Sequence, residues 1–121
     1  MDDLIAFVKA RLDEEEASAL AMIAAFEGIA EWMIAENGEF DYTVTAGQLA
    51  TEAVADMWRE DAAVWIARHD PARVLREIAA MRAIVAAYER APDWPGGEDV
   101  RHLAAIWNDR ADYLPEWAPA V

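Results

Sequence analysis

The chain has 121 residues, 24 acidic against 10 basic side chains, a net charge of −14, no cysteine and six tryptophans. This length predicts a single domain over residues 1–121, and the absence of cysteine excludes disulfides, thiolate metal sites and a cysteine nucleophile. The charge argues against direct nucleic-acid binding and against binding to anionic membranes, because phosphates repel an acidic surface.

The start of the chain and its hydropathy predict a cytoplasmic protein. Met1-Asp2-Asp3 lacks the basic start of a signal peptide, and no apolar run approaches the about 18 residues of a membrane span. Residues 1–60 carry 14 acidic and 3 basic side chains. Such a surface favours a basic protein partner, although it is also typical of a solvated surface in an acidic proteome.

Residues 2–27 have the three-and-four spacing of a helix with one apolar face. Its inward positions are predicted to be Leu4, Ile5, Val8, Leu12, Ala19, Leu20, Ile23 and Phe26. Asn37-Gly38 then predicts the turn of a small β-hairpin over residues 32–44. The competing interpretation extends the first helix to Ala35 and ends it at Gly38.

Thr45-Ala46-Gly47-Gln48 has the form of a capping box and predicts a second helix from Thr45 to about His69. Asp70 is then the expected N-cap and Pro71 the first residue of a third helix, which ends before Pro92.

After a loop at residues 91–97, a fourth helix is expected over Glu98–Asn108, followed by an extended aromatic tail. Its predicted inward residues are Val100, Leu103, Ala104, Ile106 and Trp107. The predicted fold is mainly α, with about four helices around one core and the hairpin as an added element.

Three blocks of this sequence resemble a known family. They are the start Met1-Asp2-Asp3-Leu4-Ile5 with the residues up to 16, the corner Ala67-Arg68-His69-Asp70-Pro71-Ala72-Arg73-Val74-Leu75, and the ending at residues 101–107 with Tyr113-Leu114-Pro115-Glu116-Trp117. The family consists of small actinobacterial and actinophage proteins without an assigned activity. The resemblance implies a shared fold and genomic setting, and no reaction.

The corner is the sharpest candidate site. Three arginines and a histidine gather there around the aspartate that precedes a helix, and the candidate residues are Arg68, His69, Asp70, Arg73 and Arg76. Free backbone N–H groups of the third helix, with these side chains, would suit a phosphate or carboxylate. The alternative is that the Asp70 carboxylate caps the helix and already fills the anion position.

Trp58 and Trp65 are seven residues apart and are expected to share one face of the second helix. Tryptophan is enriched at binding hot spots, and an apolar face too wide for one small domain indicates a partner surface or a homo-oligomer. The sequence therefore favours a non-enzymatic protein-binding or regulatory module that needs no cofactor.

The alternative function is a Mg²⁺-dependent hydrolase resembling the all-α nucleotide pyrophosphatases. Its metal ligands would be carboxylates one helical turn apart on facing helices. Such spacings occur at Asp13, Glu16, Glu52 and Asp56. Because these pairs arise often by chance among 24 acidic residues, the hydrolase remains the weaker hypothesis.

Overall fold

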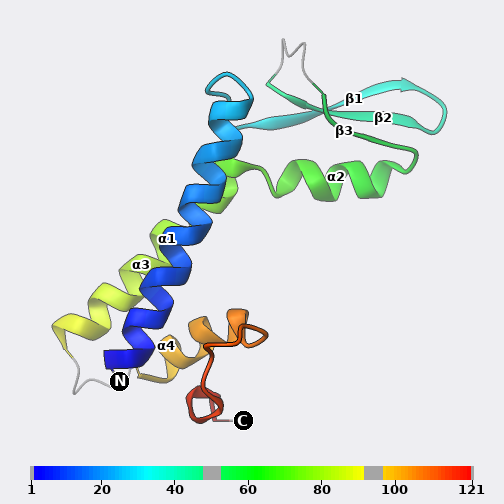
Figure 1. The fold of residues 1–121 in the computed structure, drawn as a ribbon. Helices are drawn as coiled ribbons and strands as arrows, with labels where there is room; N and C mark the ends of the chain where they lie inside the picture. The colour runs from blue at the N-terminus through cyan, green and yellow to red at the C-terminus, as the bar shows by residue number, and fades with distance from the viewer. Residues whose placement is uncertain (1, 48–52, 92–96, 121) are drawn as a thin grey trace. The chain divides into compact units, whose positions relative to one another are not determined.

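The computed structural model describes residues 2–47, 53–91 and 97–120. These residues form four α-helices, two short 3₁₀ segments and one three-stranded antiparallel sheet (Figure 1). In chain order the elements are α1 (Asp2–Ala25), β1 (Trp32–Gly38), β2 (Asp41–Ala46), β3 (Ala53–Met57), α2 (Glu60–Arg68), α3 (Pro71–Arg90), α4 (Gly97–Ala104), η1 (Ala105–Trp107) and η2 (Pro115–Trp117). The prediction of a mainly helical fold with a β element is confirmed.

The chain divides into two compact units. The terminal unit combines Met1–Glu15 with Glu77–Val121, and the central unit is Glu16–Arg76. Helices α1 and α3 each continue from one unit into the other along the sequence. That the chain is a single domain around one core stays a prediction.

The terminal unit has a core of large aliphatic and aromatic side chains. Its most deeply buried members come from α1 and α4, as the apolar spacing predicts: Leu4, Val8, Leu12 and Val100 are at most 1 % exposed. Trp117 lies with its ring centroid 5.1 Å from that of Phe7 and 5.7 Å from that of Tyr113. Aromatic pairs at such distances add about 0.5–1.5 kcal/mol to the burial of the rings, so the aromatic tail closes this core.

Arg11 is the buried charged residue among the described positions of the terminal unit. Its guanidinium lies 3.0 Å from Asp112 and 2.9 Å from Glu14, and 5.1 Å from the centroid of the Phe7 ring. A buried charge must be paired to be tolerated, and these contacts pair it.

In the central unit, α1 stops at Ala25 because the backbone turns left-handed. Glu27 and Gly28 have φ of 57° and 83°, and the Gly28 N–H donates to the Ile23 carbonyl at 2.8 Å. Such a turn is a common helix end, with glycine carrying the left-handed conformation at low cost. The alternative that extended the first helix to Ala35 is therefore wrong. Leu20, predicted to be inward, is 50 % exposed.

The hairpin prediction is confirmed, with a shifted turn. β1 pairs with β2 from Trp32 opposite Ala46 to Gly38 opposite Asp41, so the chain reverses at Glu39 and Phe40 rather than at Asn37-Gly38. Asn37 falls in a bulge between Glu36 and Gly38. The glycine thus serves the irregular strand end, and Phe40 takes the left-handed position with φ of 58°.

The predicted helix from Thr45 to His69 is wrong over its first half. Thr45 and Ala46 end β2, residues 53–57 form β3, and α2 spans only Glu60–Arg68. The Thr45 hydroxyl donates to the Gly47 carbonyl at 3.3 Å instead of capping a helix, and Gln48 lies outside the described residues. Strand pairing between β2 and β3 has overridden the local helix signal.

Helix α2 lies along one face of the sheet (Figure 1). Ala63 and Val44 are completely buried, and Ala46 is 1 % exposed. Because these side chains are small, helix and sheet backbones can approach closely. The central unit is therefore held by a modest core of alanine and valine.

The remaining helices follow the predictions closely. α3 begins at Pro71 after the cap Asp70, and the Arg73 N–H donates to Asp70 Oδ1 at 2.9 Å. Within α4 and η1, Val100, Ala104 and Trp107 are buried, whereas Ile106 is 57 % exposed and was wrongly predicted inward. The helical path tightens to 3₁₀ at Ala105, which changes the face that Ile106 presents.

Candidate protein-binding surface

Trp58 follows β3 directly and precedes α2, so it does not share a helix with Trp65 as predicted. Its side chain is 67 % exposed. The Arg59 guanidinium lies 5.9 Å from the centroid of the Trp58 ring and pairs with Asp61 at 2.7 Å. The cation thus lies against the ring while its charge is balanced by the first turn of α2.

Trp65 lies on α2 and is 62 % exposed. Its ring stacks on that of His69, with centroids 3.9 Å apart and planes 21° apart. His69 Nδ1 lies 2.7 Å from the Trp65 carbonyl oxygen, which can only accept, so Nδ1 carries the proton of this hydrogen bond. The stack restricts the rotamers open to the exposed Trp65, and this restriction lowers the entropy lost when a partner covers the ring.

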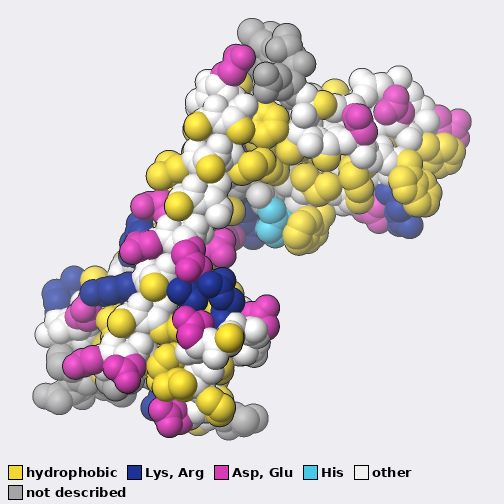
Figure 2. All heavy atoms as spheres, in the orientation of Figure 1, with side chains coloured by type: hydrophobic (Ala, Val, Ile, Leu, Met, Phe, Trp, Pro, Cys, Tyr) yellow, Lys and Arg dark blue, Asp and Glu magenta, His cyan; other side chains and the backbone are white. Residues whose placement is uncertain are grey.

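A shallow cavity of about 400 Å³ lies on α2 beside the Trp65 ring. It is lined by Glu60, Asp61, Val64, Trp65 and Arg68. With Trp58 and Arg59 these residues form what we call the α2 surface. Tryptophan and arginine next to one another are the residue types that dominate binding hot spots. Figure 2 shows hydrophobic side chains gathered over α2 and the neighbouring strands.

Several charges at this surface are perturbed by their neighbours. Hydrogen bonds from Arg59 hold the pKa of Asp61 below its usual value, and the same contact raises the pKa of Arg59. Loss of hydration raises the pKa of Tyr42 on β2, and nearby carboxylates raise it further. Those carboxylates are Glu60, Glu36 and Glu39. Negative charge is therefore concentrated where the sheet meets the start of α2.

The charges of the central unit are separated along the chain. Residues 16–58 contain eight acidic and no basic side chains, and the four arginines of the unit follow from Arg59 onward. The sheet therefore carries acidic side chains without basic ones, whereas the segment from Arg59 to the start of α3 carries both signs, with Glu60 and Asp61 in the first turn of α2.

The predicted anion site is occupied by the protein's own carboxylate. Asp70 Oδ1 accepts from the Arg73 N–H at 2.9 Å and Oδ2 accepts from the Trp32 N–H at 3.1 Å. Arg68, His69 and Arg76 are exposed and Arg73 is half-buried, all within one stretch of the central unit. This geometry matches the alternative in which Asp70 caps the helix, and Asp70 joins β1 to α3.

The three described carboxylates of the Mg²⁺ hypothesis do not lie on facing helices. Asp13 and Glu16 are on α1, Asp56 is on strand β3, and Glu52 lies outside the described residues. Asp13 pairs with Arg82 at 2.8 Å, and Asp56 accepts from the Thr43 hydroxyl at 2.9 Å. Among the described residues, no group of three or more His, Asp or Glu side chains is placed to hold a metal ion.

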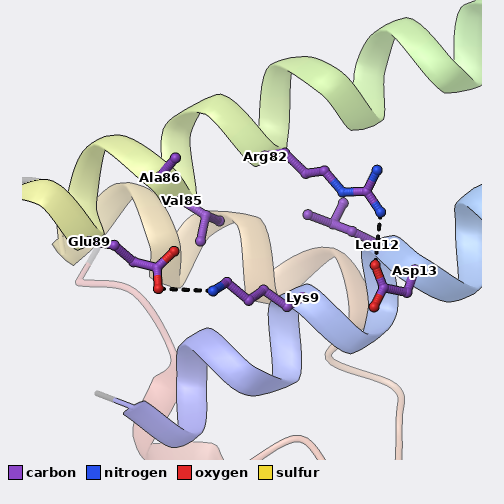
Figure 3. Close-up of a pocket in the computed structure, with 7 residues that line it drawn as sticks. All are labelled: Lys9, Leu12, Asp13, Arg82, Val85, Ala86 and Glu89. Atoms are coloured by element: carbon purple, nitrogen blue, oxygen red, sulfur yellow. Dashed lines mark hydrogen bonds and ion pairs between the residues drawn. The ribbon is translucent and has the colours of Figure 1, made fainter.

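The terminal unit has a second cavity, of about 270 Å³, between α1 and α3 (Figure 3). Its floor is Leu12, Val85 and Ala86, and the ion pairs Lys9–Glu89 and Asp13–Arg82 close at 2.9 and 2.8 Å beside it. The four charges satisfy each other across the two helices, so this cavity serves the packing of α1 on α3.

Sequence reasoning missed Phe40 and Arg59. Phe40 is 65 % exposed at the hairpin turn, and Arg59 contacts both Trp58 and Asp61. The Trp-Arg-Glu-Asp order at residues 58–61 carried a signal, because a basic residue that directly follows a tryptophan and comes two residues before an aspartate is placed for these contacts. No local signal marked Phe40, since aromatic residues rarely take the left-handed conformation.

The family model of DUF6221, a family of unknown function, matches residues 1–119. The chain belongs to the DUF6221 family. The family resemblance expected from the three blocks is thereby confirmed as membership of a family without an assigned function. No curated protein and no solved structure matches this DUF6221 chain. In its described helices, no segment is long and apolar enough to cross a membrane.

Proposed function

We propose that this DUF6221 protein is a non-enzymatic module that binds a protein with a basic surface. The observation that carries the proposal is the exposure of Trp58 and Trp65, 67 % and 62 %, on the same α2 surface. Two exposed tryptophans cost solvation free energy in the isolated protein, and covering them would return it on binding.

Charge supports a basic partner. The net charge of −14 and the uninterrupted acidic stretch of residues 16–58 attract a basic protein and increase the rate of encounter at low salt. The same field repels nucleic acid and anionic lipid, so a basic nucleic-acid-binding protein is a fitting class of partner. Such a partner would bind either its nucleic acid or the acidic surface of this protein, so the two would compete.

The setting we propose is the cytoplasm of an actinobacterium or of its phage-infected cell. The lack of cysteine suits a reducing compartment, and the resemblance of the three blocks supplies the organisms. Self-association through the α2 surface is the second way to cover the tryptophans, and light scattering after size exclusion separates a homo-oligomer from a monomer that awaits a different protein.

The test is affinity capture from an actinobacterial lysate at low and moderate salt, comparing the wild-type chain with the double variant Trp58→Ser/Trp65→Ser. Ile106→Ser is the matched control, because Ile106 is 57 % exposed on the terminal unit. A basic protein recovered in stoichiometric amount by wild type and control, weakened by salt and lost in the double variant, supports the proposal. Equal recovery by all three proteins, or no enriched protein, contradicts it.

A further inference from the structure

Strand β1 is an outer strand of the sheet. At the start of the strand, the backbone groups that point away from β2 are already hydrogen-bonded. The sheet order is β1-β2-β3. On the side away from β2, the Trp32 N–H donates to Asp70 Oδ2 at 3.1 Å, and the Ala30 carbonyl accepts from the Ala72 N–H at 3.0 Å. The corner between α2 and α3 therefore satisfies the first outward groups of this edge.

The next outward groups belong to Ile34 and Glu36. In an antiparallel pair, the backbone groups of alternate residues point toward and away from the partner strand. The Glu31 carbonyl accepts from the Gly47 N–H at 2.8 Å, so Glu31, Met33 and Ala35 face β2. Ile34 and Glu36 follow Trp32 in pointing away, and no strand of the described residues pairs with that side.

The first part of β1 has few features that would prevent another strand from pairing with this edge. The strand Trp32–Gly38 contains no proline and no lysine, and its bulge comes only after Glu36. Met33 and Ile34 are 40 % and 38 % exposed. An edge strand without proline, lysine or an early bulge can pair with another strand, and the charge that this edge does carry, on Glu36, is acidic.

The charge around the edge selects the occupant. Tyr42 lies opposite Glu36 in the register, and its pKa is raised by loss of hydration and then by the carboxylates of Glu60, Glu36 and Glu39. A second copy would bring an identical acidic edge against this one, at a net charge of −14 per chain. A basic segment of another protein would instead be attracted.

We propose that the β1 edge takes up an extended segment of a partner protein as a fourth strand, with a basic side chain beside Glu36 and an apolar one beside Ile34. This inference rests on the proposed function and names its binding mode. The two neighbouring side chains of the added strand lie two residues apart, because alternate residues share a sheet face. Backbone bonds to Ile34 and Glu36 provide affinity, and the two side chains provide selectivity.

The probe is a fluorescent ten-residue threonine-rich peptide with an arginine two positions from a valine, titrated against the full chain by anisotropy. A peptide with glutamate in place of the arginine is the control ligand. We expect binding of the basic peptide, at least tenfold weaker binding of the acidic one, and slowed hydrogen exchange of the Ile34 and Glu36 amides. Exchange of the Met33 and Ala35 amides, which already face β2, should change little.

Two variants separate backbone from charge. Ile34→Pro removes an outward N–H without deleting a bond to β2, and should weaken the peptide at least tenfold, whereas Ile34→Val should stay within twofold. Glu36→Lys should weaken binding of the basic peptide about as much as Ile34→Pro does, although it leaves the backbone N–H groups unchanged. Glu15→Lys, an equal charge change on the exposed part of α1 in the terminal unit, should have a much smaller effect.

Strand addition is overturned if the peptide binds without protecting the two outward amides, or if Ile34→Pro and Glu36→Lys bind as wild type. Failure of the edge is distinguishable from failure of the proposed function. If wild type and Ile34→Pro capture the same partner and Trp58→Ser/Trp65→Ser does not, the α2 surface is the binding site and strand addition at β1 is refuted. Formation of dimers that Ile34→Pro abolishes would show a second copy on the edge and overturn the inference.

Discussion

Asp70 joins two elements of the central unit, because its two carboxylate oxygens accept hydrogen bonds from the backbone of α3 and of β1. Replacing it by alanine removes the acceptor of the Arg73 N–H at the start of α3 and that of the Trp32 N–H on β1. We expect Asp70→Ala to lower the free energy of unfolding by about 1–3 kcal/mol, measured by urea denaturation.

Asp70→Asn is the control for this prediction. Its single amide oxygen can keep the cap on α3 but cannot accept both bonds, so its loss should be intermediate. Equal stability of Asp70→Ala and wild type would show that neither bond matters to folding.

Asp61 provides the pH prediction. Because hydrogen bonds from Arg59 lower its pKa in the folded state, the ionised carboxylate stabilises the fold above the usual aspartate value of about 3.9. That contribution is lost as the pH falls through the lower folded value. In Arg59→Gln we expect the Asp61 pKa, followed by carbon NMR of the carboxyl, to rise toward its usual value, with no change in Arg68→Gln. An unaltered titration in Arg59→Gln would refute the pairing.

At the scale of elements, the hairpin turn carries a residue in an unfavourable conformation. Phe40 has φ of 58° and is 65 % exposed, so it holds the left-handed backbone at a cost that its side chain does not repay by burial. Asparagine tolerates this conformation better. We expect Phe40→Asn to raise the free energy of unfolding by about 0.5–1 kcal/mol in thermal or urea denaturation.

Phe40→Val is the contrasting variant, because a β-branched residue is strained at positive φ. It should destabilise the protein or at best leave it unchanged. If Phe40→Asn is less stable than the wild-type protein, Phe40 contributes a contact that outweighs its backbone strain.

Element by element, periodic apolar patterns predicted the long helices and failed where pairing partners lay far away. α1 and α3 follow from three-and-four spacing, and the Asp70-Pro71 step fixed the start of α3. β3 was missed because Ala53 and Ala55 favour a helix by themselves, and only pairing with β2 makes them part of a strand. The hairpin turn moved because strand register, set by Val44 and Ala46 facing α2, outweighed the local preference of Asn37-Gly38.

At the scale of the whole molecule, we predict that the two units unfold together. Helices α1 and α3 each run through both without interruption, so opening one unit would break helices that the other needs. Native-state hydrogen exchange should give the same free energy for the amides of Val8, in the terminal unit, and of Val44, in the central unit.

Leu12→Ala is the perturbation for this test. It should lower the stability of both reporters by about 2–5 kcal/mol, because it opens a cavity in the core of the terminal unit. A loss confined to Val8 would divide the chain into two domains.

The sequence alone determined the helical character, the acidic surface and the corner at Asp70, since each follows from local pattern or composition. It also singled out Trp58 and Trp65, although it placed them on one helix. Only the tertiary structure decided that Trp58 directly follows strand β3 and that the Asp70 carboxylate occupies the predicted anion site at the start of α3. It also decided that the backbone of Ile34 and Glu36 lies on the outer edge of β1. The physical reason is that strand pairing and side-chain capping join residues that are distant along the chain. The local spacing of apolar and polar residues does not predict such contacts.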